Sequence, residues 1–262
     1  MKIFVGQNTI TRARDNMQTE NLLEKMTSLK LVGMADALRE QTENANIGQL
    51  SFEERLSIIL ERESLHREDK RLSNLLRQAK LREKASFEDI VYEASRKLNR
   101  SNILSLANCG FINNHHNIAI TGASGCGKTF MACAIGHKAC RLGYKVRYIH
   151  LPRFIEDISI SHADGSYTKI MTQLNKVDLL ILDDFGLTPI TSKQCHDLFN
   201  IIEERHQLKS TIITSQIPID KWHQYLGEPT LADAILDRIL QNINRIEMGG
   251  ESMRKRKNID AS

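Results

Sequence analysis

The stretch AITGASGCGKTF, from Ala119 to Phe130, constrains the fold of this chain more than any other feature of the sequence. Four of its residues fit the pattern G-x-x-x-x-G-K-[ST], namely Gly122, Gly127, Lys128 and Thr129. In such a loop the glycines let backbone N–H groups turn toward bound phosphates, the lysine reaches the β- and γ-phosphate oxygens, and the hydroxyl ligates Mg²⁺ at a helix N-terminus. The pattern therefore predicts a strand, a phosphate-binding loop and a helix in succession.

The sequence from residue 106 onward alternates short apolar runs with helical stretches, as the strands and crossover helices of a parallel α/β sheet do. We predict strands at 117–121, 145–150, 178–184, 210–216 and 243–248. The phosphate-binding loop then follows the first strand at its C-terminal end, where ligands bind in such sheets. The predicted loop residues are Gly122, Ala123, Ser124, Gly125, Cys126, Gly127, Lys128, Thr129 and Phe130.

Residues 1–105 contain no proline and carry apolar residues at helical spacing, which predicts an all-helical N-terminal domain. The stretch NIGQLSFEER interrupts it, and there Ser51 and Glu54 have the spacing of a capping box. We therefore predict two domains, a helical one over 1–105 that binds DNA or a partner and a nucleotide-binding one over 106–262.

Two observations on composition predict a cytoplasmic protein without membrane contact. No apolar run approaches the roughly 20 residues that a membrane span needs, and the N-terminus lacks the apolar core of a signal peptide. The five cysteines are odd in number and contain no C-x-x-C pair, which fits a reducing compartment.

The stretch DLLILDDFG places two carboxylates at the end of a predicted strand, near the phosphate-binding loop. We expect Asp183 to hold the hydration shell of Mg²⁺ and Asp184 to orient or deprotonate an attacking water. Consecutive strand residues point to opposite faces unless the strand has ended, so a solvated carboxylate or helix cap remains the alternative for Asp184.

The stretch TIITSQIP ends a predicted buried strand in polar residues, Thr214, Ser215 and Gln216. Such a tip can contact the γ-phosphate or the attacking water, and Gln216 is the best candidate because an amide both donates and accepts hydrogen bonds. The alternative is an ordinary loop before Pro218.

The stretch LADAILDRILQN predicts an amphipathic helix that carries Arg238. This arginine is either an arginine finger, which delivers its charge to the transition state of a neighbouring subunit, or a partner of Asp233 or Asp237 in a salt bridge.

Basic residues are concentrated in one stretch, although the net charge of the chain is only +4. The stretch predicts contact with the phosphates of duplex DNA, and its alternative is a solvated helix face. Further basic residues are Arg96, Lys97, Arg100 and the run RKRK from Arg254 to Lys257. The predicted DNA-contacting residues are Arg67, Lys70, Arg71, Arg77, Lys80, Arg82 and Lys84.

The motifs GASGCGKT, LLILDDFG, TIITSQIP, W-x-x-x-L…AILDRIL and GGESMRKR follow one another here as in the IstB-like transposition helper ATPases. The stretch LKLVGMADALRE also resembles that family's helical domain, so the resemblance covers nearly the whole chain. The family is related to the DnaC helicase loaders and to DnaA within the AAA+ class. The resemblance thus implies a P-loop AAA+ core with a five-stranded parallel sheet.

This resemblance implies an ATPase, with ATP and Mg²⁺ as cofactors, that multimerises on duplex DNA, deforms it, and recruits and stimulates its partner transposase. It implies that Lys128, Asp184, Gln216 and Arg238 are catalytic, with Gln216 at the sensor-1 position and Arg238 at the finger position, and that Thr129 and Asp183 hold the metal. Relatives usually carry Asn where this chain has Gln216. The sequence also leaves no room after Arg254 for the helical lid of most AAA+ proteins.

Two other functions use a similar core. A DnaC-like loader would bind a hexameric helicase through the N-terminal helices. A small-molecule kinase would also use a phosphate-binding loop, but the sequence shows no lid-like arginine cluster and no second substrate site.

Overall fold

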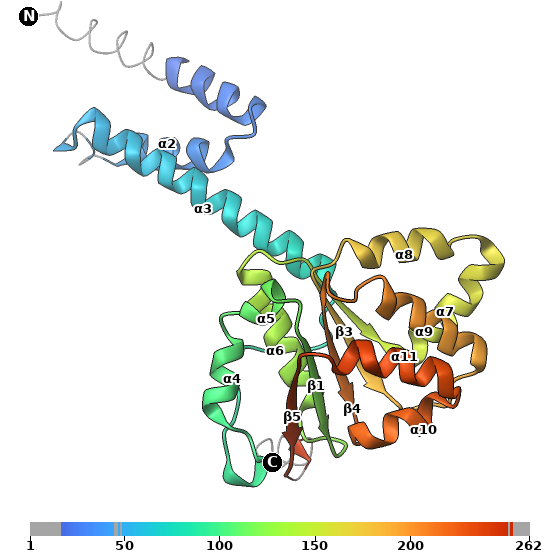
Figure 1. Cartoon of the computed structure of the whole chain (residues 1–262). Helices are drawn as coiled ribbons and strands as arrows, with labels where there is room; N and C mark the ends of the chain where they lie inside the picture. The colour runs from blue at the N-terminus through green and yellow to red at the C-terminus, as the bar shows by residue number, and fades with distance from the viewer. Residues whose placement is uncertain (1–16, 45–46, 48, 251, 254–262) are drawn as a thin grey trace, which may run out of the picture. The chain divides into compact units, whose positions relative to one another are not determined.

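The protein divides into two compact units, Met1–Ser73 and Asn74–Ser262, in a computed structural model that describes residues 17–44, 47, 49–250 and 252–253. Figure 1 shows the helices of the first unit and the sheet of the second. The domain boundary predicted near residue 105 differs from this division by the segment 74–105, which packs with the sheet. Among the residues described, no helix is both long and apolar enough to cross a membrane.

The helical unit contains α2 (Val32–Glu43) and the first part of α3 (Phe52–Ala79), and residues 17–28 are also helical. The predicted capping box begins α3. The Ser51 backbone N–H donates to Glu54 Oε2 at 2.7 Å, and the Glu54 N–H donates to Ser51 Oγ at 3.2 Å. Two otherwise unpaired N–H groups at the helix end are thereby satisfied.

The helices α2 and α3 approach each other closely at Gly33. A Cβ atom there would lie 2.7 Å from the Arg62 carbonyl oxygen and 2.8 Å from Glu63 Cα, so only glycine fits. No side chain next to α2 caps its N-terminus, but Glu63 of α3 accepts the Met34 N–H at 3.2 Å. The hydrogen bond from Arg67 is the main cause that lowers the pKa of Glu63, which keeps a negative charge at the N-terminus of α2.

The second unit is built on a five-stranded parallel sheet, as predicted, and its strand order is β2-β3-β4-β1-β5 (Figure 1). The strands are β1 (Asn117–Gly122), β2 (Val146–His150), β3 (Leu179–Phe185), β4 (Ser210–Ser215) and β5 (Ile243–Met248). The strands β2, β3, β4 and β1 are largely buried, and their apolar runs are those of a sheet covered on both faces.

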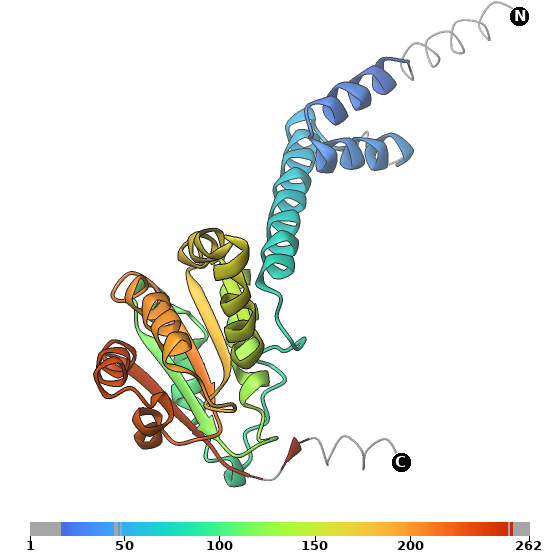
Figure 2. The same cartoon turned by 90° about the vertical axis from the view of Figure 1, so that its right-hand side faces the viewer.

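Helices cover both faces of this sheet (Figure 2). The crossover from β1 to β2 runs in one direction along the sheet and every later crossover in the other, so right-handed connections place α6 opposite α7, α8, α9 and α11. The crossover helices are α6 (Lys128–Arg141), α7 (Leu151–Asp164), α8 (Tyr167–Asn175), α9 (Ser192–Glu203) and α11 (Pro229–Leu240). The main core lies under α7, α8, α9 and α11 and includes Leu180, Leu182 and Ile213.

Shorter elements complete the second unit. They are η2 (Ala94–Arg96), α4 (Arg100–Leu106), α5 (Gly110–Asn113), η3 (Ile219–Lys221) and α10 (Trp222–Leu226). After β5 the described residues are Gly249, Gly250, Ser252 and Met253, and they form no helical lid. The basic run from Arg254 to Lys257 lies outside the described residues. All five cysteines are buried free thiols.

Candidate functional site

The loop between β1 and α6 has the backbone that its sequence predicts. Gly122 has φ 151°, and a Cβ atom there would lie 2.1 Å from the Met248 carbonyl oxygen. Gly127 has φ 94° and precedes α6, where a Cβ atom would lie 2.8 Å from Arg96 Nη2. Both glycines are therefore required by the close approach of neighbouring groups as well as by the turn itself.

Lys128 begins α6 and is buried against its own loop. Its Nζ donates to the Gly122 carbonyl oxygen at 2.9 Å and to the Ala123 carbonyl oxygen at 2.8 Å. These two bonds fix the ammonium group inside the curve of the loop. A nucleotide held by the backbone N–H groups there would meet the lysine at its terminal phosphates.

Asp183 lies at the end of β3 with no exposed surface. Thr129 Oγ1 lies 3.0 Å from both carboxylate oxygens, and the hydroxyls of Tyr148 and Thr214 donate to the carboxylate at 2.6 Å and 2.5 Å. Burial is the main cause that raises the pKa of Tyr148, followed by its hydrogen bond to Asp183, so the phenol keeps its proton. This buried carboxylate is thus satisfied by three hydroxyl groups.

The two residues predicted to hold the metal therefore lie side by side. Mg²⁺ prefers oxygen ligands and is usually bound by one or two carboxylates together with substrate phosphates. The Thr129 hydroxyl and the Asp183 carboxylate supply that chemistry next to the phosphate-binding loop. The residues present fit a complex of Mg²⁺ with a nucleoside triphosphate.

Asp184 faces the same side of the site as Asp183, which an ordinary strand would not allow. It adopts a left-handed conformation with φ 63°, and the pairing of β3 with β4 shifts register between Leu182 and Phe185. Its N–H donates to Thr214 Oγ1 at 3.0 Å. This bulge turns the second carboxylate toward the cavity, where its Oδ2 lies 3.4 Å from His150 Nε2.

The polar end of β4 divides its roles among three residues. Thr214 binds Asp183 and the backbone of Asp184, whereas Ser215 Oγ donates to the Phe185 carbonyl oxygen at 2.7 Å. Gln216, the residue favoured from sequence, lines the cavity. Gln216 therefore lies in the cavity lining, whereas Thr214 makes the direct contacts to the Asp183 carboxylate and to the Asp184 backbone.

Some of these groups line a cavity of about 740 Å³. Its lining includes much of the phosphate-binding loop together with part of the segment that precedes the sheet, which the sequence assigned to the helical domain. The residues from that segment are Arg82, Glu83, Lys84, Asp89, Val91 and Arg96, and the others are Ser124, Gly125, Gly127, Lys128, Thr129, Phe130, His150, Asp184, Leu187, Gln216 and Met253.

Two arginines of this segment were not recognised as site residues from sequence. Arg96 Nη2 donates to the Cys126 carbonyl oxygen in the loop at 2.7 Å. Arg82, which the sequence analysis predicts to contact DNA, lies beside Asp183 and Asp184. No motif marks either arginine, because their partners are far away in sequence.

The predicted DNA-contacting residues all have exposed side chains but differ in their surroundings. Arg82 and Lys84 line the cavity, and Arg67 pairs with Glu63 within α3. The others, Lys70, Arg71, Arg77 and Lys80, have exposed side chains on α3 or just after it.

Arg238 does not line the cavity of its own chain. Its guanidinium pairs with Glu203 of α9, lies 5.2 Å from the centre of the Phe199 ring and donates to the Ala234 carbonyl oxygen at 2.8 Å. Arg238 thus forms a salt bridge, as the alternative from sequence proposed. Its partner is Glu203 of α9, so the expected pairing with Asp233 or Asp237 was wrong.

Residues 24–261 match the protein family described as IstB-like ATP binding protein. A similar protein, the insertion sequence ATP-binding protein y4pL of Sinorhizobium fredii, is 45% identical over 233 residues, which cover 89% of this chain and 95% of that protein. A similar ATP-binding protein in an insertion sequence of Mycobacterium tuberculosis is 33% identical over 240 residues, covering 90% and 94% of the two chains.

The fold of this chain resembles those of several solved structures. The DnaI structure superposes with a TM-score of 0.55 at 20% identity, covering 63% of this chain and 91% of that one. The DnaC helicase loader gives 0.53 at 19% identity, covering 62% and 94%. AMPPCP-bound DnaA from Aquifex aeolicus gives 0.54 at 22% identity, covering 69% and 56%. These similarities establish the AAA+ fold of the sheet unit.

Proposed function

Because the chain belongs to the family of IstB-like ATP-binding proteins, we propose that it is the Mg²⁺-dependent ATPase of an insertion sequence, which assembles on duplex DNA and recruits and stimulates the transposase. The observation that carries the proposal is that Lys128, Thr129 and Asp184 line one cavity, while the buried carboxylate of Asp183 is hydrogen-bonded to Thr129. The similar proteins of Sinorhizobium fredii and Mycobacterium tuberculosis, which belong to insertion sequences, support the link to transposition.

Each residue of the site has a part in the proposed hydrolysis. The loop from Gly122 to Phe130 binds the phosphates, and Lys128 neutralises charge on the β- and γ-phosphates. Thr129 and Asp183 hold Mg²⁺, which supplies charge neutralisation when it is bound. Asp184 accepts a hydrogen bond from the attacking water and Gln216 orients it, so that the water is aligned with the terminal phosphate.

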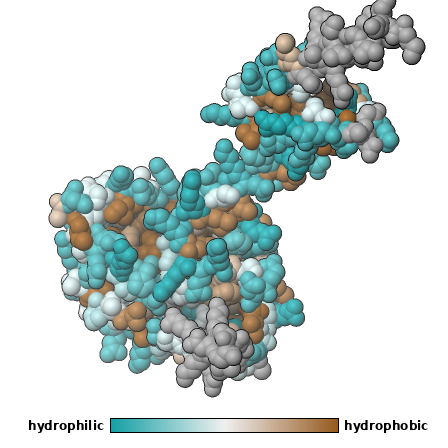
Figure 3. All heavy atoms as spheres, turned by 180° about the vertical axis from the view of Figure 1, so that it is seen from behind, coloured by the Kyte–Doolittle hydropathy of each residue, from teal (hydrophilic) through white to brown (hydrophobic). Residues whose placement is uncertain are grey.

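The helical unit offers surfaces for both macromolecular partners. The exposed basic residues Lys70 and Arg71 of this unit, and Arg77 of α3 in the second unit, supply charge for the DNA backbone. The same unit exposes ten of the sixteen large apolar side chains that are exposed among the described residues, and Figure 3 shows apolar surface there. Exposed apolar patches of this kind are typical of surfaces that bind other proteins.

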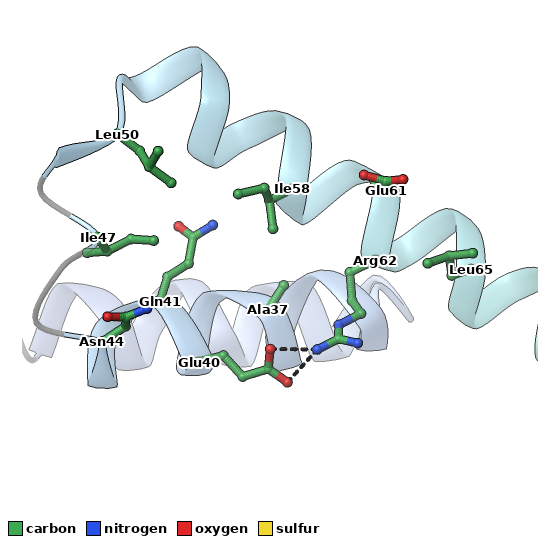
Figure 4. A pocket seen from close by; sticks show the side chains of 10 residues that line it. All are labelled: Ala37, Glu40, Gln41, Asn44, Ile47, Leu50, Ile58, Glu61, Arg62 and Leu65. Atoms are coloured by element: carbon green, nitrogen blue, oxygen red, sulfur yellow. Dashed lines mark hydrogen bonds and ion pairs between the residues drawn. The ribbon is translucent and has the colours of Figure 1, made fainter.

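Part of that surface forms a groove between α2 and α3 of about 380 Å³. Ile47, Leu50 and Ile58 point into it, and an ion pair between Glu40 and Arg62 closes one side (Figure 4). A groove beside a helix whose lining has both apolar and polar side chains suits an amphipathic segment of a partner protein. We assign this groove to the contact with the transposase.

Purified protein tests the proposal directly. We expect Mg²⁺-dependent ATP hydrolysis that rises when duplex DNA is added, and capture of the transposase of the same insertion sequence in the presence of ATP. Omission of Mg²⁺, and a metabolite mixture in place of DNA, serve as controls. Binding of a hexameric helicase in place of the transposase would favour the DnaC-like loader, and stimulation by a metabolite would favour a kinase.

A further inference from the structure

The guanidinium of Arg82 lies between the two carboxylates of the candidate site. Its Nη1 is 3.7 Å from Asp183 Oδ2 and 3.8 Å from Asp184 Oδ2. A hydrogen bond with Tyr148 is the main cause that raises the pKa of Arg82, and the two carboxylates act in the same direction. A permanent positive charge therefore sits at the edge of the site where the metal-binding and water-orienting carboxylates meet.

The chain around Arg82 is anchored, so its position follows from packing and not from the ion pairs alone. Leu81 lies against α6, because a Cβ atom at Gly136 would be 3.0 Å from Leu81 Cδ2. Ala85 is buried, and the Gln78 carbonyl oxygen accepts a hydrogen bond from Arg147 Nη1 at 3.3 Å. The Arg82 side chain itself is 49% exposed and lines the cavity. Fixed neighbours thus present a guanidinium that remains accessible.

The negative charges of Asp183 and Asp184 make a positive charge at Arg82 useful for binding a nucleotide. Asp183 and Asp184 together repel a nucleoside triphosphate, whose terminal phosphate carries more negative charge than either of the other two. Of the two arginines among the described residues that line the cavity, Arg96 donates to the carbonyl oxygens of Val91 and Cys126. Arg82 instead offsets the carboxylate charge, and its five N–H donors allow it to bind a carboxylate along one edge and a phosphate along another.

We propose that Arg82 binds the terminal phosphate of ATP within its own chain and makes the site prefer ATP over ADP. This role rests on the proposed ATPase function and adds a residue that acts in cis, in contrast to the finger proposed for Arg238. It also assigns to nucleotide binding a residue that the sequence assigned to DNA. Because Arg82 follows the end of α3 by three residues, the same contact would report the terminal phosphate to the connection between the two units.

The test compares a fluorescent, non-hydrolysable ATP analogue with fluorescent ADP, both titrated with Mg²⁺ into the full chain. A hydrogen bond to a charged group contributes about 1.5–3 kcal/mol, which corresponds to roughly a tenfold or larger change in affinity. We therefore expect Arg82→Ala to weaken binding of the ATP analogue about tenfold or more and to leave ADP binding within about twofold. Arg141→Ala, which removes an exposed arginine at the end of α6 that does not line the cavity, is the matched control and should change neither affinity.

The outcomes separate this inference from the proposed function. Wild-type protein that binds neither nucleotide would contradict the ATPase proposal before any variant is made. An unchanged preference for ATP in Arg82→Ala, or an equal loss for both nucleotides, would overturn the role of Arg82. So would a loss of duplex binding with an unchanged nucleotide preference, because that result returns Arg82 to DNA contact. If circular dichroism shows that Arg82→Ala does not fold, Arg82→Gln removes the charge while it retains hydrogen-bond donors.

Discussion

At the scale of single residues, the site depends on a backbone conformation that aspartate adopts at a cost. A non-glycine residue in the left-handed region costs on the order of 1–3 kcal/mol, and Asp184 is held there by the register shift of β3 and by Thr214. Strain of this kind is found mainly at functional sites. Asparagine tolerates the same conformation, so it can replace the charge of Asp184 without a change in the backbone.

We therefore predict different phenotypes for two substitutions in the site. Lys128→Ala should abolish ATP binding, because it removes the ammonium that the loop holds in place. Asp184→Asn should bind ATP normally and hydrolyse it about 10²-fold more slowly or worse, because a neutral amide orients and deprotonates water poorly. Equilibrium binding of a labelled ATP analogue and steady-state phosphate release distinguish the two. Wild-type turnover in Asp184→Asn would make this carboxylate a solvated group with no part in hydrolysis.

At the scale of elements, the helical unit depends on the contact of α2 with α3 at Gly33. The carboxylate of Glu63 caps α2 only while the two helices stay this close. A methyl group at position 33 would meet backbone atoms of α3, which cannot move independently of that helix. A change that separates α2 from α3 at Gly33 would therefore also remove the Glu63 cap from the N-terminus of α2.

We predict that Gly33→Ala destabilises the helical unit by about 1–3 kcal/mol, the usual cost of overpacking. Amide hydrogen exchange should accelerate in α2 and in the first half of α3, while amides of β1 and β3 keep their protection. Glu43→Ala, an exposed change at the end of α2, is the control and should leave exchange unchanged. Unaltered protection of α2 in Gly33→Ala would show that the helices have room to separate.

At the scale of the whole molecule, the proposed function requires DNA and other copies of the chain. Of the basic residues predicted to contact DNA, Lys70, Arg71 and Arg77 are exposed on α3, whereas Arg82 and Lys84 line the cavity. Arg238 likewise lies away from the cavity of its own chain and is held by α9. In the proposed function, the exposed basic residues of α3 act on DNA and Arg238 acts on the nucleotide site of another copy of the chain.

We predict that replacing Lys70, Arg71 and Arg77 together with alanine weakens binding to all duplex sequences alike. Each phosphate contact that is lost should also reduce the slope of log affinity against log salt concentration by about 0.9. Fluorescence anisotropy with two unrelated duplexes over a range of salt concentrations measures both effects. Normal binding by the triple variant would place the DNA contact on another surface.

We predict that a mixture of Arg238→Ala and Lys128→Ala chains regains ATP hydrolysis that neither variant shows alone. The first chain keeps an intact nucleotide site and the second an intact arginine, and fingers in trans contribute on the order of 10³ to 10⁵ in rate. The control is to add Glu203→Gln to the Lys128→Ala chain. This change removes the charged partner of Arg238 but leaves its guanidinium, so it separates the salt bridge from the arginine itself. Mixed assemblies without activity, combined with a lower melting temperature of Arg238→Ala, would assign Arg238 to the salt bridge with Glu203 alone.

Local patterns in the sequence determined much of this protein. The glycine spacing predicted the loop, apolar runs predicted the five strands, and Ser51 with Glu54 predicted the start of α3, because each depends on neighbours within a few residues. The tertiary structure alone decided that Asp184 turns toward Asp183 and that Arg82 lies beside both carboxylates. It also decided that Arg238 pairs with Glu203 and not with the aspartates of its own helix. These contacts join residues that are 30 to 102 positions apart, and no local spacing encodes which distant charges a fold will bring together.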